Sequence, residues 1–204
     1  AIDYDPTQPT RFIPYLDAHN LDGAAMSQLL PVGDFKWLTP EEIAKFNLKG
    51  IHKNSTTGYI IECDLQYPTD RHDEHNDYPL APEHLTVTQD MLSEFAKSFP
   101  GTLPRPTKKL VPNLRDKTLY VTHYRNLQFY VSHGLIVTKI HRILSFNQKP
   151  WLKPYIDYCT LQRQLATNEF ESDLQKLKAN ACFGKSMEQV RNRVNVRLIA
   201  DQHK

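Results

Sequence analysis

The sequence lacks any apolar run of about 18 residues, so we expect no membrane-spanning helix and no membrane partner. It does not open with a charged stretch followed by an apolar one, so no signal peptide is recognisable. Its three cysteines, Cys63, Cys159 and Cys182, lie far apart and form no Cys-x-x-Cys pair. This spacing argues against a zinc site or a disulfide framework and favours a reducing compartment.

Repeats, low-complexity segments and a Gly-x-Ser-x-Gly elbow around Ser27 or Ser55 are also lacking, so hydrolase chemistry has no support. The 204 residues suffice for one sizeable core or parts of two. The chain begins with Ala rather than Met and begins close to the first motif described below. We therefore expect it to be a fragment of a longer protein.

Charge is unevenly distributed although the net charge is only +2. Residues 1–100 carry 7 Lys and Arg and 16 Asp and Glu, whereas residues 101–204 carry 18 and 7. A basic half is what a surface that contacts phosphates requires. Ordinary segregation of charge between two faces that pack together is the alternative.

The segment 176–185, Lys-Leu-Lys-Ala-Asn-Ala-Cys-Phe-Gly-Lys, places a cation, an amide and a ring on one side of a helix. Lys176, Asn180 and Phe183 are spaced by four and three residues, which returns to the same helical face. We expect the helix to break at Gly184. Such a face suits a nucleoside triphosphate, although a solvated helix face is the alternative for this pattern alone.

The segment 15–28, Tyr-Leu-Asp-Ala-His-Asn-Leu-Asp-Gly-Ala-Ala-Met-Ser-Gln, supplies complementary chemistry. Residues 12–16 read as a strand that ends at Asp17, and residues 23–29 read as a short helix. A carboxylate at the end of a buried strand commonly holds Mg²⁺ against a phosphate.

These two segments resemble motifs A and B of family B DNA polymerases, in the protein-primed branch of organellar plasmids, some viruses and transposons of the Polinton or Maverick kind. Further stretches in the right order are similar to that branch, so the resemblance covers residues 8–197. They are residues 30–37, 75–83, 110–117 and 123–156.

The resemblance implies an α+β fold: part of a right-hand polymerase palm, with antiparallel strands and an insertion, plus helical fingers. Residues 1–30 would be the palm segment with motif A, residues 31–157 the palm continuation with a protein-priming insertion, and residues 158–204 the fingers with motif B. The implied function is template-directed nucleotidyl transfer from a deoxynucleoside triphosphate to a DNA primer or protein primer. The implied partners are a DNA template-primer and a terminal priming protein. The implied location is intracellular, with the nucleus as a candidate for a transposon-encoded enzyme.

The resemblance also assigns roles to residues. Asp17 would be the catalytic carboxylate and, with the Ala18 carbonyl, a ligand of two Mg²⁺ ions. The nucleotide-binding residues would be Asn20, Leu21, Asp22, Arg163, Lys176, Asn180 and Phe183. Gly184 and Lys185 would lie against DNA, with Gly184 allowing a close backbone approach.

Several positions depart from the family pattern. Asp22 stands where the family has a Tyr that packs under the sugar and excludes a 2′-hydroxyl, and Ala25 stands where Trp is usual. The chain ends before the third motif, which supplies the other metal carboxylates, so we expect that this chain alone cannot polymerise. The alternative is a catalytically inactive relic or a nucleic-acid-binding module.

Local patterns predict further elements. A capped helix is expected over residues 39–47, strands over 58–67, 120–124 and 137–146, and helices over 88–99 and 126–133. Residues 100–106 hold three prolines and read as a linker. No Gly or Pro occurs between Tyr155 and Phe183, and Phe170, Leu174, Leu177 and Ala181 predict an inward apolar stripe. Residues 71–75, Arg-His-Asp-Glu-His, read as a solvated turn rather than a metal loop.

Overall fold

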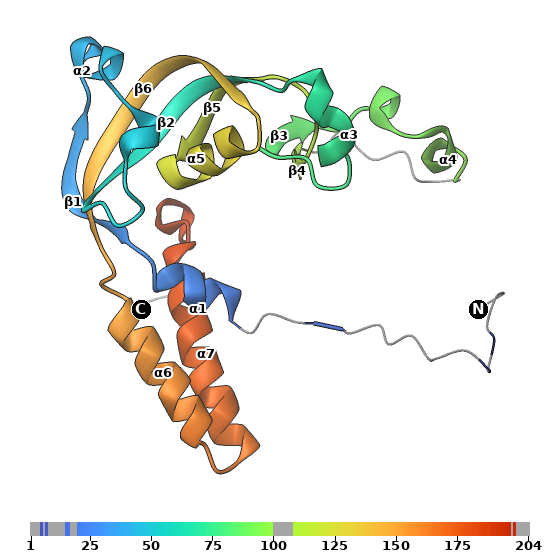
Figure 1. Ribbon diagram of the computed structural model, residues 1–204. Coiled ribbons are helices and arrows are strands. Elements are labelled where there is room, and N and C mark those ends of the chain that lie inside the picture. Colours follow the sequence, from blue (N-terminus) through green and yellow to red (C-terminus); the bar gives the residue numbers. More distant parts are fainter. Residues whose placement is uncertain are drawn as a thin grey trace. The chain divides into compact units, whose positions relative to one another are not determined.

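The computed structural model describes residues 5, 7, 15, 16, 20–99, 108–196 and 198. The fold is mixed α+β with a curled antiparallel sheet, as the sequence predicts at that level. The chain divides into two compact units (Figure 1), one of residues 1–30 and 150–204 and the other of residues 31–149. None of the helices in the described ranges has the length and apolarity needed to cross a bilayer.

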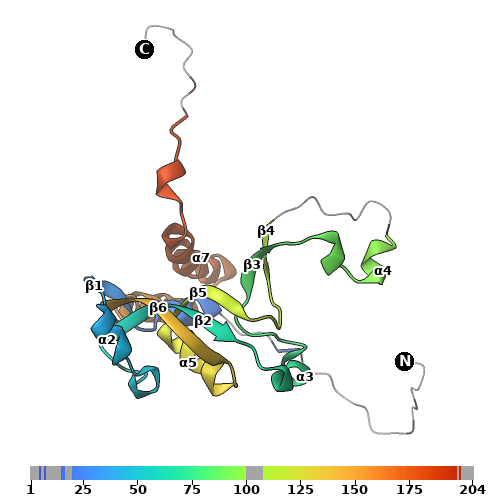
Figure 2. The ribbon, with the colours of Figure 1, turned by 90° about the horizontal axis from the view of Figure 1, so that it is seen from above.

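A four-stranded sheet organises the unit of residues 31–149. Its strands are β1 (Leu30–Trp37), β6 (Ile136–Lys149), β2 (Thr57–Gln66) and β5 (Lys117–His123), in that spatial order. The central strand β2 pairs antiparallel with both β5 and β6, and the register places Ile61 opposite Thr122 and Ile143. Figure 2 shows how strongly the sheet curls. The three predicted strands are confirmed, and β6 extends beyond its predicted ends.

The helix α5 (Tyr124–Ser132) covers one face of this sheet and builds the main core. Ile61, Cys63, Leu65, Tyr124 and Leu127 are all fully or almost fully buried there. Burying each large apolar side chain contributes about 1.5–3 kcal/mol. The helix predicted over residues 126–133 is confirmed and begins two residues earlier, and Gly134 follows it at φ 100°, a conformation that favours glycine.

The predicted capped helix is α2 (Pro40–Ala44), and it ends three residues earlier than expected. Thr39 accepts a hydrogen bond from the Glu42 N–H, and Glu42 accepts one from the Thr39 N–H at 2.8 Å. The short η1 (Leu48–Gly50) follows. This reciprocal capping explains why the N-terminus was predictable.

The single helix predicted over residues 88–99 is wrong, because the chain forms η3 (Gln89–Met91) and then α4 (Glu94–Lys97). Leu92 is extended between them, and the Ser93 hydroxyl accepts a hydrogen bond from the Ala96 N–H at 3.1 Å. Serine at this position starts a new helix rather than continuing the old one. The predicted linker at residues 100–106 lies outside the described residues.

The remaining elements of this unit are η2 (Thr69–Arg71), α3 (His72–His75), and the antiparallel pair β3 (Glu83–Thr86) and β4 (Lys108–Val111). The solvated turn predicted at residues 71–75 is wrong for His75, which is only 6% exposed. Its Nδ1 lies 2.8 Å from the Tyr67 hydroxyl, which also accepts a hydrogen bond from the Leu80 N–H. His75 therefore belongs to a buried polar network.

The other unit contains α1 (Leu21–Met26), α6 (Lys153–Leu165), α7 (Glu169–Ser186) and η4 (Val190–Asn192). The helices α6 and α7 form a hairpin, and α1 packs against both (Figure 1). Although no Gly or Pro occurs between residues 155 and 183, the chain reverses at residues 166–168 and forms two helices there. The strand predicted over residues 12–16 falls mainly outside the described residues, and Tyr15 and Leu16 are exposed and belong to no strand.

Candidate functional site

The reversal between α6 and α7 depends on a local capping arrangement. The Asn168 side chain accepts a hydrogen bond from the Glu171 N–H at 2.9 Å. The Glu171 carboxylate in turn accepts hydrogen bonds from the Thr167 N–H at 3.0 Å and the Thr167 hydroxyl at 3.2 Å. Both hydrogen bonds from Thr167 lower the pKa of the Glu171 carboxyl, and the bond from the Thr167 backbone N–H has the larger effect. An Asn followed three residues later by Glu is a helix start, and this signal could have located the reversal in the sequence.

The hairpin packs through small and medium side chains. Met26, Ile156, Cys159 and Ala179 are buried together, one from α1, two from α6 and one from α7. The apolar stripe predicted to point inward on α7 is wrong, because Phe170 is 76% exposed and Leu177 is 64% exposed. Among the described residues, α6 and α1 instead cover the face that carries Ala179, whose small side chain permits close helix approach.

The N-terminus of α1 is fixed by Asn20, whose backbone has a left-handed conformation at φ 57°. Its side-chain oxygen accepts a hydrogen bond from the Gly23 N–H at 2.9 Å. The Ser27 hydroxyl closes the other end of α1 by donating to the Gly23 carbonyl at 2.9 Å. Residues 20–27 therefore form a short helix that is capped at both ends.

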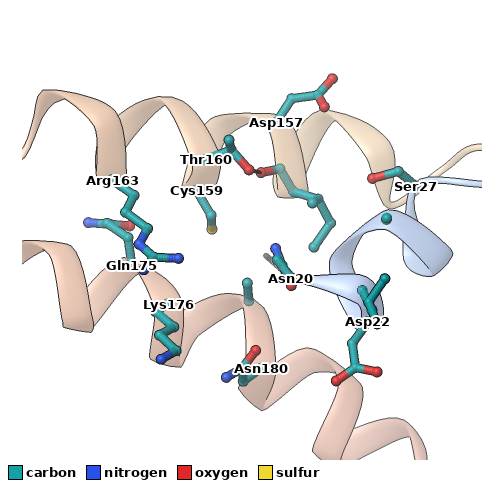
Figure 3. A pocket seen from close by; sticks show the side chains of 14 residues that line it. Asn20, Asp22, Ser27, Asp157, Cys159, Thr160, Arg163, Gln175, Lys176 and Asn180 are labelled. Carbon is teal, nitrogen blue, oxygen red and sulfur yellow. Dashed lines mark hydrogen bonds between the residues drawn. The ribbon is translucent and has the colours of Figure 1, made fainter. Parts of the chain in front are cut away.

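A cavity of about 520 Å³ lies among α1, α6 and α7 (Figure 3). Its lining includes six of the residues singled out from the sequence: Asn20, Leu21, Asp22, Arg163, Lys176 and Asn180. Phe183, Gly184 and Lys185 do not line it, and Gly184 does not end the helix, since α7 continues to Ser186. Asp17 and Ala18 lie outside the described residues.

Some polar side chains of the cavity already form hydrogen bonds or ion pairs, and others do not. Asp157 is paired with Lys153, whose Nζ lies 2.7 Å from a carboxylate oxygen, and the Arg163 Nε donates to the Ser172 hydroxyl at 3.4 Å. Within the described part of the chain, no hydrogen bond or ion pair engages the side chains of Asp22, Lys176 or Asn180. As far as the described residues go, the cavity therefore offers a cation, a carboxylate and an amide that no other side chain engages.

The arrangement of these groups is ordered along the cavity. Figure 3 shows Arg163 and Lys176 toward one end, Asp22 toward the other, and Asn180 between them. Lys176 and Asn180 are one turn apart on α7, which corresponds to about 6 Å along the helix axis. One end can therefore bind an anionic group, and the other can accept hydrogen bonds.

Sequence reasoning missed several lining residues, among them Asp157, Thr160 and Gln175. The Gln175 side-chain oxygen is buried and accepts no hydrogen bond from any described residue. Ile156, Thr160 and Arg163 follow each other at spacings of four and three on α6, and this spacing could have revealed the lining face.

No metal site is evident in the described ranges, where no three His, Cys, Asp or Glu side chains are grouped as ligands. Two histidines outside the cavity lining are engaged elsewhere. His141 Nε2 lies 2.9 Å from Asp64, and His133 Nδ1 lies 2.9 Å from the Phe129 carbonyl oxygen.

Comparison with protein-family models, with curated proteins and with solved structures gives no match to this chain.

Proposed function

We propose that this chain is the palm and fingers portion of a DNA-directed DNA polymerase of the protein-primed family B type, and that its cavity binds the incoming deoxynucleoside triphosphate. One observation carries the proposal. Residues 20–22 of the first motif and Lys176 and Asn180 of the second, more than 150 residues apart in sequence, line the same cavity. The sequence motifs and the cavity therefore point to the same group of residues.

The cationic end of the cavity suits a triphosphate. Lys176 has no carboxylate partner among the described residues, and the contact found there for the Arg163 guanidinium is a long hydrogen bond to Ser172. Hydrogen bonds from cations to phosphate oxygens are among the stronger polar contacts in proteins. Arg163 would bind two oxygens through its planar guanidinium group, whereas Lys176 would act as a movable point charge.

The amide of Asn180 would orient the ligand between phosphate and sugar, because it can donate and accept hydrogen bonds. In the same proposal, α6 and α7 are the fingers and the curled sheet of β1, β6, β2 and β5 is the palm continuation with its insertion. A terminal priming protein and a DNA template-primer are the proposed partners, with Phe183, Gly184 and Lys185 on the side of the nascent base pair and DNA.

Magnesium would be held by the Asp17 carboxylate and the Ala18 carbonyl, which stand only three and two residues before Asn20 in sequence. Hard oxygen donors of this kind fit Mg²⁺, which prefers one or two carboxylates together with substrate oxygens. Magnesium bound there would supply alignment of the primer 3′-oxygen with the α-phosphate and neutralise the developing charge. The chain's own contribution would be to hold the triphosphate through Lys176 and Arg163.

The test is equilibrium binding of labelled dATP, in Mg²⁺ and with a primer-template, to the purified chain and two lysine variants. Lys176→Ala is expected to weaken binding about tenfold, because it removes a charged contact to phosphate. Lys178→Ala is the matched control, since Lys178 is on the same helix and does not line the cavity. It is expected to change the affinity by less than about twofold.

Two results would contradict this assignment. Equal effects of the two substitutions would show that only net charge matters. Absence of triphosphate binding with retained DNA binding would favour the alternative, a nucleic-acid-binding module or relic without polymerase chemistry.

A further inference from the structure

Asp22 is a feature of the cavity that a phosphate site does not explain. It is the second residue of α1, is exposed, and lines the cavity together with Lys176 and Asn180. Within the described residues its carboxylate forms no ion pair and accepts no hydrogen bond. A carboxylate repels phosphate oxygens, so the part of a ligand that lies beside Asp22 should be a cationic group or a hydrogen-bond donor.

A nucleoside triphosphate has no cationic group at neutral pH, and its donors are the sugar hydroxyls and the amino and ring N–H groups of the bases. Base amino groups differ in number and position from one nucleotide to the next, whereas sugar hydroxyls are common to all. The order of side chains in Figure 3, with the cations at one end, Asn180 between and Asp22 at the other, follows the order of phosphate and sugar in the ligand. Asp22 is therefore placed to meet the sugar.

An ionised carboxylate accepts hydrogen bonds at both oxygens and has no proton to donate. A ribose offers two adjacent hydroxyl donors, at the 2′ and 3′ positions, and a carboxylate that accepts from the ribose 2′-hydroxyl is a known means of recognising this sugar. A deoxyribose offers only the 3′-hydroxyl. The side chain at position 22 should therefore favour a ligand that carries the 2′-hydroxyl.

We propose that Asp22 makes this cavity a ribonucleotide-accepting site, in which its carboxylate accepts a hydrogen bond from the ribose 2′-hydroxyl and ATP binds more tightly than dATP. This inference rests on the proposed function, since it assumes that the cavity binds a nucleoside triphosphate. The preference should be about threefold to tenfold, the effect of one charge-assisted hydrogen bond at a partly exposed site.

The experiment measures the dissociation constants of ATP, dATP and 3′-deoxy-ATP, which share one base, at a fixed Mg²⁺ concentration. The unaltered chain should bind ATP and 3′-deoxy-ATP more tightly than dATP. Asp22→Ala should bring the ratio of the dATP and ATP constants to about one. A 2′-hydroxyl contact predicts that 3′-deoxy-ATP resembles ATP, whereas a 3′-hydroxyl contact predicts that it binds more weakly than ATP.

The control is Asp157→Ala, which removes a carboxylate from the cavity lining that is already paired with Lys153. It changes the local charge for every nucleotide equally and should leave the ratio unaltered. Suppose that dATP binding depends on Lys176, but that the dissociation constant of dATP divided by that of ATP is one or below in the unaltered chain. This result would overturn the inference about Asp22 and leave the proposed function standing. Failure of every nucleotide to bind would overturn both.

Discussion

The Asn20 side chain closes directly over Gly23. Its oxygen lies 2.9 Å from the Gly23 nitrogen, and a Cβ atom added at position 23 would stand 2.2 Å from the Asn20 amide nitrogen. Any side chain at position 23 must therefore displace the cap of α1. Because Asn20 also lines the cavity, the backbone of this turn and the ligand site depend on the same contact.

Gly23→Ala is expected to destabilise the unit that contains α1 by about 1 kcal/mol, the usual value of an N-terminal cap. It should also weaken dATP binding, because Asn20 would leave its position in the cavity lining. Chemical denaturation and equilibrium dATP binding measure the two effects.

Gly184→Ala is the matched control, because Gly184 lies inside α7 and an added Cβ would meet nothing within 4 Å. Alanine is the better helix former, so this substitution should stabilise the protein by about 0.5–1 kcal/mol. Effects of the same sign at the two glycines would contradict the packing described at Gly23.

A second prediction concerns the ion pair of Glu83 and Lys117. The Lys117 side chain is only 1% exposed, and its Nζ lies 3.1 Å from the Glu83 carboxylate. Burial lowers the pKa of Lys117, whereas hydrogen bonds from Asn113 and Lys117 outweigh the burial of Glu83 and lower the pKa of that carboxyl. The short separation pairs the buried ammonium group of Lys117 with the Glu83 carboxylate.

Glu83→Ala should cost about 3 kcal/mol of unfolding free energy, because it leaves a buried cation without its partner. Urea denaturation measures this loss. Glu74→Ala removes a carboxylate from an exposed pair with Arg71 and should cost no more than about 0.5 kcal/mol. Comparable losses from the two variants would show that Lys117 is not held by Glu83.

Local sequence patterns predicted individual features of the fold and of the cavity well where side-chain spacing or helix capping determines them. Lys176 and Asn180 were recognisable because residues four apart share a helix face, and the start of α2 was recognisable because Thr39 and Glu42 form a capping box. Arg163 was assigned through the family resemblance alone, and it lines the cavity because α6 turns it toward α7.

The packing of α7 could not be read from hydrophobicity. The larger apolar residues, such as Phe170 and Leu177, suggested the buried face, but the neighbouring helices in the described residues cover the face of Ala179. Close approach of two helices selects a small residue over a large one, and single-sequence periodicity does not reveal that choice. The reversal at residues 166–168 contains neither Gly nor Pro, the strongest helix breakers, so composition alone does not reveal it.

A third prediction follows from the Glu171 cap. Its folded-state pKa is lowered, so its contribution to stability is fully present above the unfolded pKa, about 4.3, and is lost as the pH falls through the folded value. Glu171→Gln should lower the melting temperature at pH 7, and the difference from the unaltered chain should shrink below about pH 4. The control Glu169→Gln removes a carboxylate of the same turn that accepts no hydrogen bond from any described residue. A difference that persists unchanged at pH 3 would rule out the charged cap.

The last prediction concerns magnesium. If Asp17 holds Mg²⁺ beside the triphosphate, then Mg²⁺ should strengthen dATP binding to the unaltered chain by about tenfold relative to excess chelator. Asp17→Asn replaces a charged ligand with a neutral one of the same shape, so it should reduce this stimulation to less than about twofold while leaving the chelator value unchanged. Asp173→Asn is the control, because Asp173 lies on α7 and does not line the cavity. Full stimulation in the Asp17→Asn variant would show that the metal is held elsewhere. The assignment of Asp17 as the magnesium ligand would then be wrong.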